Sequence, residues 1–240
     1  MLSFTRRFIL SFATAAFLSP IPAMAQDKTI MLDFVVLNRG ADLEDRLEYE
    51  QLIRPVTQRH GMSVLHQYNL DAHLGGSLKN AARLLIWEMD SPAALQAVLE
   101  DPDYIPHTDR RDDIHNMRAL TLYMGGSAQD EGQVSDAAVL VDLVVMNDGF
   151  GAEERAAYEA LIEPIAAKHG LTKIATFPIG AKANGRGPDD PLQLNLWRVE
   201  DPAGLQALFA DPEFAAHVDR RNQLHDFDEL TLFLASPGDR

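Results

Sequence analysis

The sequence predicts an α+β fold built from two tandem copies of one β-α-β-β-α-β unit, which is the ferredoxin-like order of elements. The clearest repeat is the segment Asp101–Arg111, which returns as Asp211–Arg221, and Trp87 likewise returns as Trp197. The strands and helices indicated by hydrophobic periodicity also occur in the same order in both copies. Because residue types and spacings agree along the whole unit, we interpret the chain as a duplication.

The domain boundaries follow from this repeat. We expect a first ferredoxin-like repeat at residues 26–126, a linker of small and polar residues at 127–136, and a second repeat at 137–240. A four-stranded sheet covered by helices on one face leaves its other face bare. Two such sheets can bury their bare faces against each other, so we expect one closed α+β barrel, an intrachain pseudo-dimer.

Each element of the first repeat has a local signature. Ile30–Asn38 alternates as a strand does, and Asp42–His60 has helical spacing with Gly61 as its stop. Asp before Pro opens a helix, because Asp caps it and Pro suits its first position. The remaining predicted elements are strands at Met62–Leu70, Arg83–Met89 and Arg118–Met124, and helices from Ser91 to Glu100 and from Asp101 through His115.

Residues 1–25 are expected to be an export signal rather than part of the fold. They contain Arg6-Arg7, then an apolar run over Phe8–Leu18, then a small-x-small cleavage site at Ala23–Ala25. The paired arginines suit either an ordinary export signal or a twin-arginine signal. We therefore predict a periplasmic or secreted mature chain that starts near Gln26, with no membrane attachment after cleavage.

Composition excludes several classes of function. The chain has no cysteine, which rules out disulfides, thiolate metal sites, iron–sulfur clusters, covalent haem and a lipoprotein anchor. Its formal charge of −15 becomes two units more negative without Arg6 and Arg7, so nucleic acid and anionic membranes are not expected partners. No phosphate loop, dinucleotide fingerprint, nucleophile elbow or HExxH zinc motif is present, so we predict no nucleotide cofactor and no metal site.

The most informative pattern is a helix face that is part apolar and part histidine and arginine. With about 100° per residue, His107, Arg111 and His115 lie on the same side as Tyr104. The copy carries Phe214, His217, Arg221 and His225. An arginine on a packing face either pairs internally, for example with a glutamate from the other helix, or binds an anionic group of a ligand bidentately.

The histidines and two asparagines extend this candidate site. His107 and His217 allow two interpretations. Each is either a structural residue at the rim of the core with its hydrogen bonds made within the protein, or a functional neutral imidazole that ligates a metal or haem iron or acts as a general base. Asn38 and Asn147 end the first strand of each repeat on the face that we expect to turn toward the helices. Beside the histidine, each would form a compact polar pair in an apolar pocket.

Other polar positions are expected to be structural. Asp33 and Asp142 alternate onto the face expected to line the barrel, where each needs a donor, with Arg83, Arg118 and Arg198 as candidates. His60 and His169 stand at helix ends, where a histidine complements the helix dipole. The first repeat is the more polar one, so if one site has lost function we expect it to be the second.

With this topology and these residues, each half resembles the dimeric α+β barrel superfamily, and in particular its antibiotic-biosynthesis-monooxygenase-like and haem-degrading-monooxygenase-like branches. Asn38 and His107 resemble the strand asparagine and the haem-ligating histidine of the haem-degrading enzymes, as do Asn147 and His217. The resemblance implies haem as a candidate ligand. Ala97 stands where those enzymes carry a tryptophan ten residues before the histidine, and the second repeat has an alanine there too.

The sequence thus predicts an exported barrel that binds a small apolar ligand with an anionic group, with the resemblance implying monooxygenase-like activity if the protein is an enzyme. The alternative is a non-catalytic ligand-binding or structural barrel whose His and Arg pairs are internal. The predicted catalytic residues are Asn38, His107, Asn147 and His217. The predicted ligand-binding residues are Trp87, Tyr104, Arg111, His115, Trp197, Phe214, Arg221 and His225.

Overall fold

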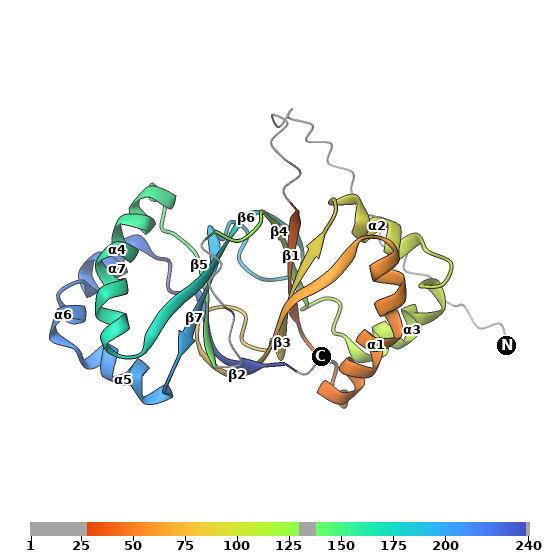
Figure 1. Ribbon diagram of the computed structural model, residues 1–240, viewed down its shortest axis with the longest axis horizontal. Coiled ribbons are helices and arrows are strands. Elements are labelled where there is room, and N and C mark those ends of the chain that lie inside the picture. The colour runs from red at the N-terminus through yellow and green to blue at the C-terminus, as the bar shows by residue number, and fades with distance from the viewer. Residues whose placement is uncertain (1–27, 130–137, 239–240) are drawn as a thin grey trace.

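A computed structural model describes residues 28–129 and 138–238, which form a closed barrel of eight antiparallel strands with helices packed outside it (Figure 1). The prediction of an α+β fold with a closed barrel is confirmed. The predicted export signal at residues 1–25 and residues 130–136 of the predicted linker lie outside the described residues. Within the described residues, no helix combines the length and apolar character needed to cross a membrane.

Both halves contain their elements in the same order. The first half consists of β1 (Thr29–Val35), α1 (Leu43–Arg59), β2 (Met62–Gly75), β3 (Arg83–Met89), α2 (Ala93–Glu100), the 3₁₀ turn η1 (Ile105–His107), α3 (Thr108–Ile114) and β4 (Thr121–Gly125). The second half consists of β5 (Val139–Val144), α4 (Ala152–Lys168), β6 (Leu171–Asn184), β7 (Gln193–Val199), α5 (Pro202–Ala210), α6 (Pro212–Ala215), α7 (Val218–Leu224) and β8 (Thr231–Pro237).

The strand order explains how the barrel closes. Within the first half the order is β4-β1-β3-β2, and within the second it is β8-β5-β7-β6. Strands β2 and β6 are each 14 residues long, so each pairs first within its own half and then with β8 or β4 of the other half. The described strands therefore leave no free edge. The helices of the two halves pack on opposite sides of the barrel (Figure 1).

The barrel separates three apolar cores. Its interior is filled by side chains from both halves, and each half has a further core between its strands and its helices. The alternation predicted for β1 is present, but the faces are reversed: Leu32 and Phe34 lie inside the barrel, whereas Met31 and Val35 face the helices. Asp33 also faces the helices. Its charged partner there is Arg46 of α1, at 3.6 Å, rather than one of the three arginines predicted as candidates.

The ends of the long helices follow their local sequence. Asp42 caps α1 by accepting hydrogen bonds from the backbone nitrogens of Glu44 and Asp45, at 2.9 and 3.0 Å. The predicted stops after α1 and α4 are confirmed, because Gly61 and Gly170 take positive φ angles of 69° and 73°. A side chain at either position would be strained in that backbone conformation.

The helix predicted from Asp101 through His115 is broken into shorter pieces. A turn of 3₁₀ helix ends at His107, and α3 starts directly after it; in the second half, α6 and α7 are separated at His217. Both histidines have ψ near 0°, outside ideal helical geometry. Pro106 occurs only in the first half, so proline alone does not cause the break.

Each Asp of the repeated Asp-Pro pair has two functions. One carboxylate oxygen of Asp101 accepts from the backbone nitrogen two residues later at 2.8 Å, and the other lies 2.6 Å from Nε2 of His60. Asp211 forms the same contacts, at 2.7 Å and with His169 at 2.6 Å. The hydrogen bond from the histidine is the main reason that the pKa of each carboxyl is lowered.

These two carboxyl groups predict a defined pH dependence. A lowered pKa in the folded state gives stability that is present above the unfolded-state pKa of about 3.9 and is lost as the pH falls through the folded-state value. We therefore expect the double variant Asp101→Asn, Asp211→Asn to have a lower free energy of unfolding than wild type at pH 5. The difference in free energy of unfolding between the two proteins should become smaller toward pH 2.5. Urea unfolding at both pH values measures this, and a gap that widens on acidification would contradict it.

Candidate ligand-binding cavities

Two cavities occupy equivalent places, between the outer face of the barrel and the helices of each half. The first-half cavity, about 130 Å³, is lined by residues that include Asp33, Arg46, Tyr49, Trp87, Tyr104 and Arg111. The second-half cavity, about 110 Å³, is lined by residues that include Asp142, Arg155, Glu159, Trp197, Phe214, Arg221 and His225. Both cavities are largely apolar, with polar groups gathered at one end, as in many small-molecule sites.

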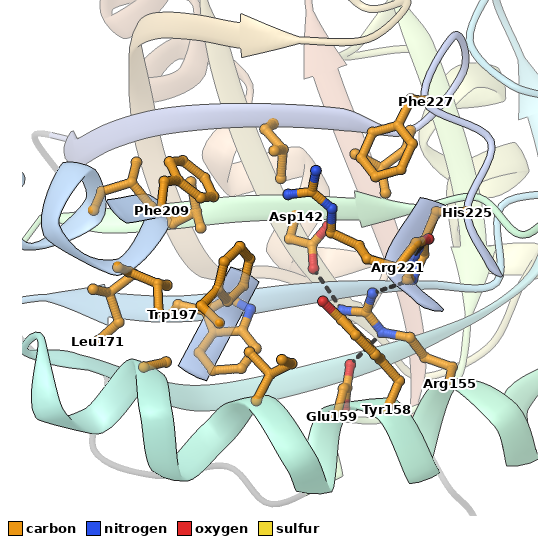
Figure 2. Close-up of a pocket in the computed structure, with 18 residues that line it drawn as sticks. Asp142, Arg155, Tyr158, Glu159, Leu171, Trp197, Phe209, Arg221, His225 and Phe227 are labelled. Atoms are coloured by element: carbon orange, nitrogen blue, oxygen red, sulfur yellow. Dashed lines mark hydrogen bonds and ion pairs between the residues drawn. The ribbon is translucent and has the colours of Figure 1, made fainter. Parts of the chain in front are cut away.

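Figure 2 shows the second-half cavity, with Trp197, Leu171 and Phe209 toward one end and the polar group around Arg155 toward the other. Helix α4 supplies Arg155 and Glu159 one turn apart, while β5 supplies Asp142. The guanidinium of Arg155 donates to Asp142 at 2.8 Å and to Glu159 at 2.6 Å. The charge of Arg155 is thus neutralised by buried carboxylates.

His225 completes this polar end as a neutral side chain. Its Nδ1 lies 2.8 Å from the backbone oxygen of Arg221, and since a carbonyl only accepts, Nδ1 carries the proton. Its Nε2 therefore accepts a hydrogen bond from Arg155 at 2.5 Å. Burial, with a contribution from Arg155, lowers the pKa of His225 to about 4, so the ring is neutral at pH 7. Neither nitrogen is left to act as a base or metal ligand.

Arg221 differs from Arg155 because its charge is not neutralised. Its guanidinium packs against the rings of Phe214 and Phe227, 5.6 and 4.9 Å from their centroids. Its side-chain hydrogen bonds go to the neutral amide oxygen of Asn222, at 3.3 and 3.4 Å. Within the described part of the chain, no carboxylate lies within ion-pair distance of Arg221.

The first-half cavity is built from the same positions with different contacts. Arg46 of α1 lies 3.0 Å from Glu50 and 3.6 Å from Asp33. Arg111, the counterpart of Arg221, forms an ion pair with Asp112 at 2.7 Å. The first-half arginine on the helix face is therefore neutralised by its neighbour, in a position where the second half has an asparagine.

Two tyrosine hydroxyls meet at the boundary of the first-half cavity. Tyr49 and Tyr104 lie 3.0 Å apart and share a hydrogen bond, and burial raises the pKa of Tyr49. In the second half Phe214 replaces Tyr104, so the hydroxyl of Tyr158 has no such partner there. Burial raises the pKa of Tyr158 to about 12. Tyr49 and Tyr158 both belong to the outer apolar core of their own half.

The structure brings most of the predicted ligand-binding residues to the cavities. Trp87, Tyr104 and Arg111 line the first-half cavity, and their counterparts Trp197, Phe214 and Arg221 line the second, together with His225. His115 is buried beside the first-half cavity, with its ring 5.3 Å from that of Tyr49. The internal Arg–Glu pairing weighed for Arg111 and Arg221 is not what the structure shows.

The polar pairs predicted between Asn38 and His107, and between Asn147 and His217, are not formed. The amide nitrogen of Asn38 donates to backbone oxygens at the C-terminal end of α3, at 2.8 to 3.1 Å, and Asn147 does the same for α7. Each side chain therefore satisfies carbonyl groups that the helix end leaves unpaired. His107 stands at the other end of α3, so the two cannot face each other across a pocket.

The histidines predicted to ligate haem also lie apart from the cavities. His107 and His217 are half-buried at the N-terminal ends of α3 and α7, and neither lines the first-half or second-half cavity. Among the residues that line these two cavities the histidine is His225, and both of its ring nitrogens are engaged. The residues present therefore do not fit haem held through these histidines.

The buried charges on the long helices were missed by the sequence interpretation. Arg46 and Glu50 on α1, and Arg155 and Glu159 on α4, form ion pairs one turn apart beneath each cavity. A usable signal was present, because Arg-x-x-Tyr-Glu occurs at both positions, 46–50 and 155–159. The arginine stands three residues before the tyrosine of this motif, so helical spacing places both on the same face.

The chain is similar to known proteins in its overall structure. No family model and no curated protein matches the chain. Among solved structures, a doubly substituted chlorite dismutase from Candidatus Nitrospira defluvii aligns over 89% of this chain and 93% of its own, with 13% identity and a TM-score of 0.53. An anthrone oxidase-like protein aligns over 91% of this chain and 97% of its own, with 11% identity and a TM-score of 0.51.

These alignments run through the barrel and the helices of both halves. The fold is a dimeric α+β barrel, here closed within one chain. At this level of identity the likeness concerns the fold alone, since one fold hosts many activities. The evidence for its function lies in its own cavities. In the second-half cavity the half-buried cation Arg221 lies among apolar and aromatic side chains.

Proposed function

We propose that the protein is an exported, small-molecule-binding α+β barrel, formed by two tandem ferredoxin-like repeats. Its second-half cavity binds an apolar ligand that carries an anionic group. The observation that carries this proposal is Arg221, a half-buried cation that lines a largely apolar cavity and makes no ion pair with any described carboxylate. The proposal moves the anion site from Arg111, the expected residue, because Asp112 already neutralises Arg111.

Charge balance supports an anion at this place. Asp142 and Glu159 are matched by Arg155, and by Lys173, whose ammonium lies 2.6 Å from Glu159. Burial alone would raise the pKa of Glu159, but Arg155 and Lys173 outweigh it and lower that pKa. The group is thus ionised and internally paired, so Arg221 remains as the cation available to a ligand. A planar guanidinium suits a carboxylate or sulfonate, which it can bind with two parallel hydrogen bonds.

The apolar part of the ligand is accommodated by the rest of the cavity. Leu171, Trp197 and Phe214 supply apolar and aromatic surface (Figure 2). Phe209 and Phe227 also line the cavity, yet 50% and 40% of their surface is exposed, so they form an apolar rim on the side of solvent. Large aromatic side chains left exposed around a cavity are typical of a binding site.

The proposal includes a candidate activity, which depends on fold likeness rather than on geometry. The resemblance to monooxygenases suggests oxidative chemistry on the bound ligand. We do not assign haem to that chemistry. His107 and His217 lie outside the two cavities, and both ring nitrogens of His225 are already hydrogen-bonded. Ligand binding is the part of the proposal that the contacts of Arg221 support directly.

The chain contains two tryptophans, one in each cavity, and this gives a site-specific assay. In a Trp87→Phe background the fluorescence of Trp197 reports on the second-half cavity. Octanoate should change it saturably, and Arg221→Gln should weaken octanoate binding by about tenfold or more, because a hydrogen bond to a charged group contributes about 1.5–3 kcal/mol.

The control for this experiment is the neighbouring cation. Arg220 is exposed and bonds Gln223, so Arg220→Gln should leave octanoate affinity unchanged. The neutral analogue 1-octanol should bind the second-half cavity more weakly than octanoate does. Equal affinity of octanoate for wild type and Arg221→Gln would show that the anion site is not at Arg221.

A further inference from the structure

The arginine of each cavity is contacted by the residue that follows it, and the chemistry of that residue differs between the halves. In the first half, Oδ1 of Asp112 lies 2.8 Å from Nε and 2.7 Å from Nη2 of Arg111. In the second half, Oδ1 of Asn222 lies 3.4 and 3.3 Å from the same two nitrogens of Arg221. Both contacts use the same edge of the guanidinium, but the accepting oxygen is charged only in the first half.

This difference decides whether the arginine is available to an anionic ligand. The carboxylate of Asp112 neutralises Arg111 through short, charge-assisted hydrogen bonds. An anionic head group at Arg111 would lie beside that carboxylate, and like charges repel. The amide oxygen of Asn222 carries no charge, so Arg221 keeps its positive charge for a ligand.

The other charged groups of the first-half cavity are also paired. Arg46 lies 3.0 Å from Glu50 and 3.6 Å from Asp33, so this second cation faces two carboxyl groups. The indole of Trp87 gives Asp33 a side-chain hydrogen bond. Both arginines that line the cavity thus have carboxylate partners among the described residues, and an uncharged ligand is the kind that leaves this balance undisturbed.

Two buried tyrosine hydroxyls supply a contact for an uncharged head group. Tyr49 and Tyr104 line the first-half cavity, with only 2% and 4% of their surfaces exposed. Each hydroxyl has one proton, and one of the two is used in the hydrogen bond between the oxygens. Arg111 donates to the Tyr104 oxygen at 3.5 Å, and neither hydroxyl bonds any other group in the described part of the chain. One O–H proton is therefore free to be donated to a carbonyl oxygen of a ligand.

We propose that residues 112 and 222 set the charge of the ligand that each cavity binds. With Asp112, the first-half cavity binds an uncharged apolar ligand that carries a carbonyl group, such as an amide. With Asn222, the second-half cavity binds an anion. The apolar bodies are alike, because equivalent residues such as Ile53 and Ile162 line the two cavities. The assignment of Asn222 rests on the proposed function, whereas the first-half cavity is a separate site.

Octanoate and octanamide test the first half, since they have nearly the same shape and differ in charge. In the Trp197→Phe protein, Trp87 is the remaining tryptophan, and octanamide should change its fluorescence saturably. Octanoate should bind at least about fivefold more weakly, and Asp112→Asn should raise octanoate affinity by about fivefold or more. Asp113→Asn removes the same charge from the next exposed residue of α3 and should leave both affinities unchanged.

The reciprocal change is made in the second half. In the Trp87→Phe protein, Asn222→Asp should weaken octanoate binding by about fivefold or more and leave octanamide binding unchanged. Gln223→Glu adds the same charge at the next exposed position of α7 and serves as the control. The side chains at 112 and 222 are exposed, so neither substitution should disturb folding.

The tyrosine contact is tested in the Trp197→Phe protein. Tyr49→Phe combined with Tyr104→Phe keeps both rings and removes both hydroxyls, so octanamide binding should weaken by about threefold or more. The double variant is needed because either hydroxyl alone keeps a proton to donate.

The outcomes distinguish this inference from the proposed function. Octanoate that binds the second-half cavity through Arg221 but is indifferent to both Asn222→Asp and Asp112→Asn would overturn the inference and leave the proposed function standing. No saturable response to octanamide in the first-half cavity, or an unchanged affinity in the folded double tyrosine variant, would also overturn it. Failure of octanoate to bind the wild-type second-half cavity would overturn the proposed function, and the first-half titrations would still decide the role of Asp112.

Discussion

Replacing Arg155 with methionine should lower the free energy of unfolding by about 3–5 kcal/mol. Methionine keeps much of the side-chain volume but removes the charge that pairs with Asp142 and Glu159. Lys173 still pairs with Glu159, so Asp142 loses most, keeping only the long hydrogen bond from Asn195. Leaving a buried carboxylate without its cation is far more costly than losing a surface pair.

The measurement is urea unfolding of Arg155→Met at pH 7, beside Arg220→Met as the control. Arg220 is exposed; its side chain bonds Gln223 and lies 5.6 Å from the centroid of the Phe150 ring, with no buried carboxylate as partner among the described residues. The control should change the free energy of unfolding by less than about 1 kcal/mol. Equal, small effects of the two substitutions would mean that the buried ion pairs do not hold α4 against the barrel.

Gly76→Ala should destabilise the protein by about 3 kcal/mol or more, from two added effects. Gly76 follows β2 with a φ angle of 94°, and a Cβ atom there would lie 1.8 Å from the backbone oxygen of Leu230 in the other half. This turn also donates backbone N–H groups to the side chain of Thr231. The clash is with backbone that the barrel holds in place, so it cannot be relieved by moving a side chain.

Gly40→Ala separates the two effects. Gly40 has nearly the same φ angle, 97°, but a Cβ there would meet no atom within 4 Å. It should therefore cost only the backbone strain, about 1–3 kcal/mol. Thermal or urea unfolding of both variants gives the difference, and equal destabilisation would show that the turn after β2 does not pack tightly on the other half.

The fold could be predicted from the sequence because the duplication doubled each weak local signal. Alternation, helix stops and the Asp-Pro pair each recur, and a bare sheet face in each half leaves one way to bury it. The face of β1 could not be assigned in this way. A strand with Phe34 on one face and Asp33 on the other is ambiguous until the position of Arg46 on α1 is known.

The candidate site was only partly predictable for a related reason. Arg111, Tyr104 and Trp87 and their counterparts reach the cavities because helical and strand periodicity place them on the faces that pack together. Asn38 was misjudged because a side-chain amide beside a helix end bonds the free backbone carbonyls there. That geometry depends on where α3 ends, and periodicity does not determine helix ends.

Differences between the halves were also hidden by the repeat. Asp112 and Asn222 are exposed neighbours of the cavity arginines, and their difference decides which arginine is neutralised. Leu85 and Asn195 differ in the same way beneath the two cavities. These pairs differ between the repeats, so the pattern of recurrence does not reveal them, yet they give the two cavities different charges and hydrogen bonds.

The proposed function requires that Arg221 bind the anionic group of an apolar ligand. A crystal structure of the protein with octanoate tests it most directly. We predict a carboxylate within about 3 Å of the Arg221 guanidinium, with two hydrogen bonds, and a chain lying toward Trp197. Octanoate bound elsewhere, in the barrel interior or at Arg111, with the second-half cavity free of it, would contradict the account.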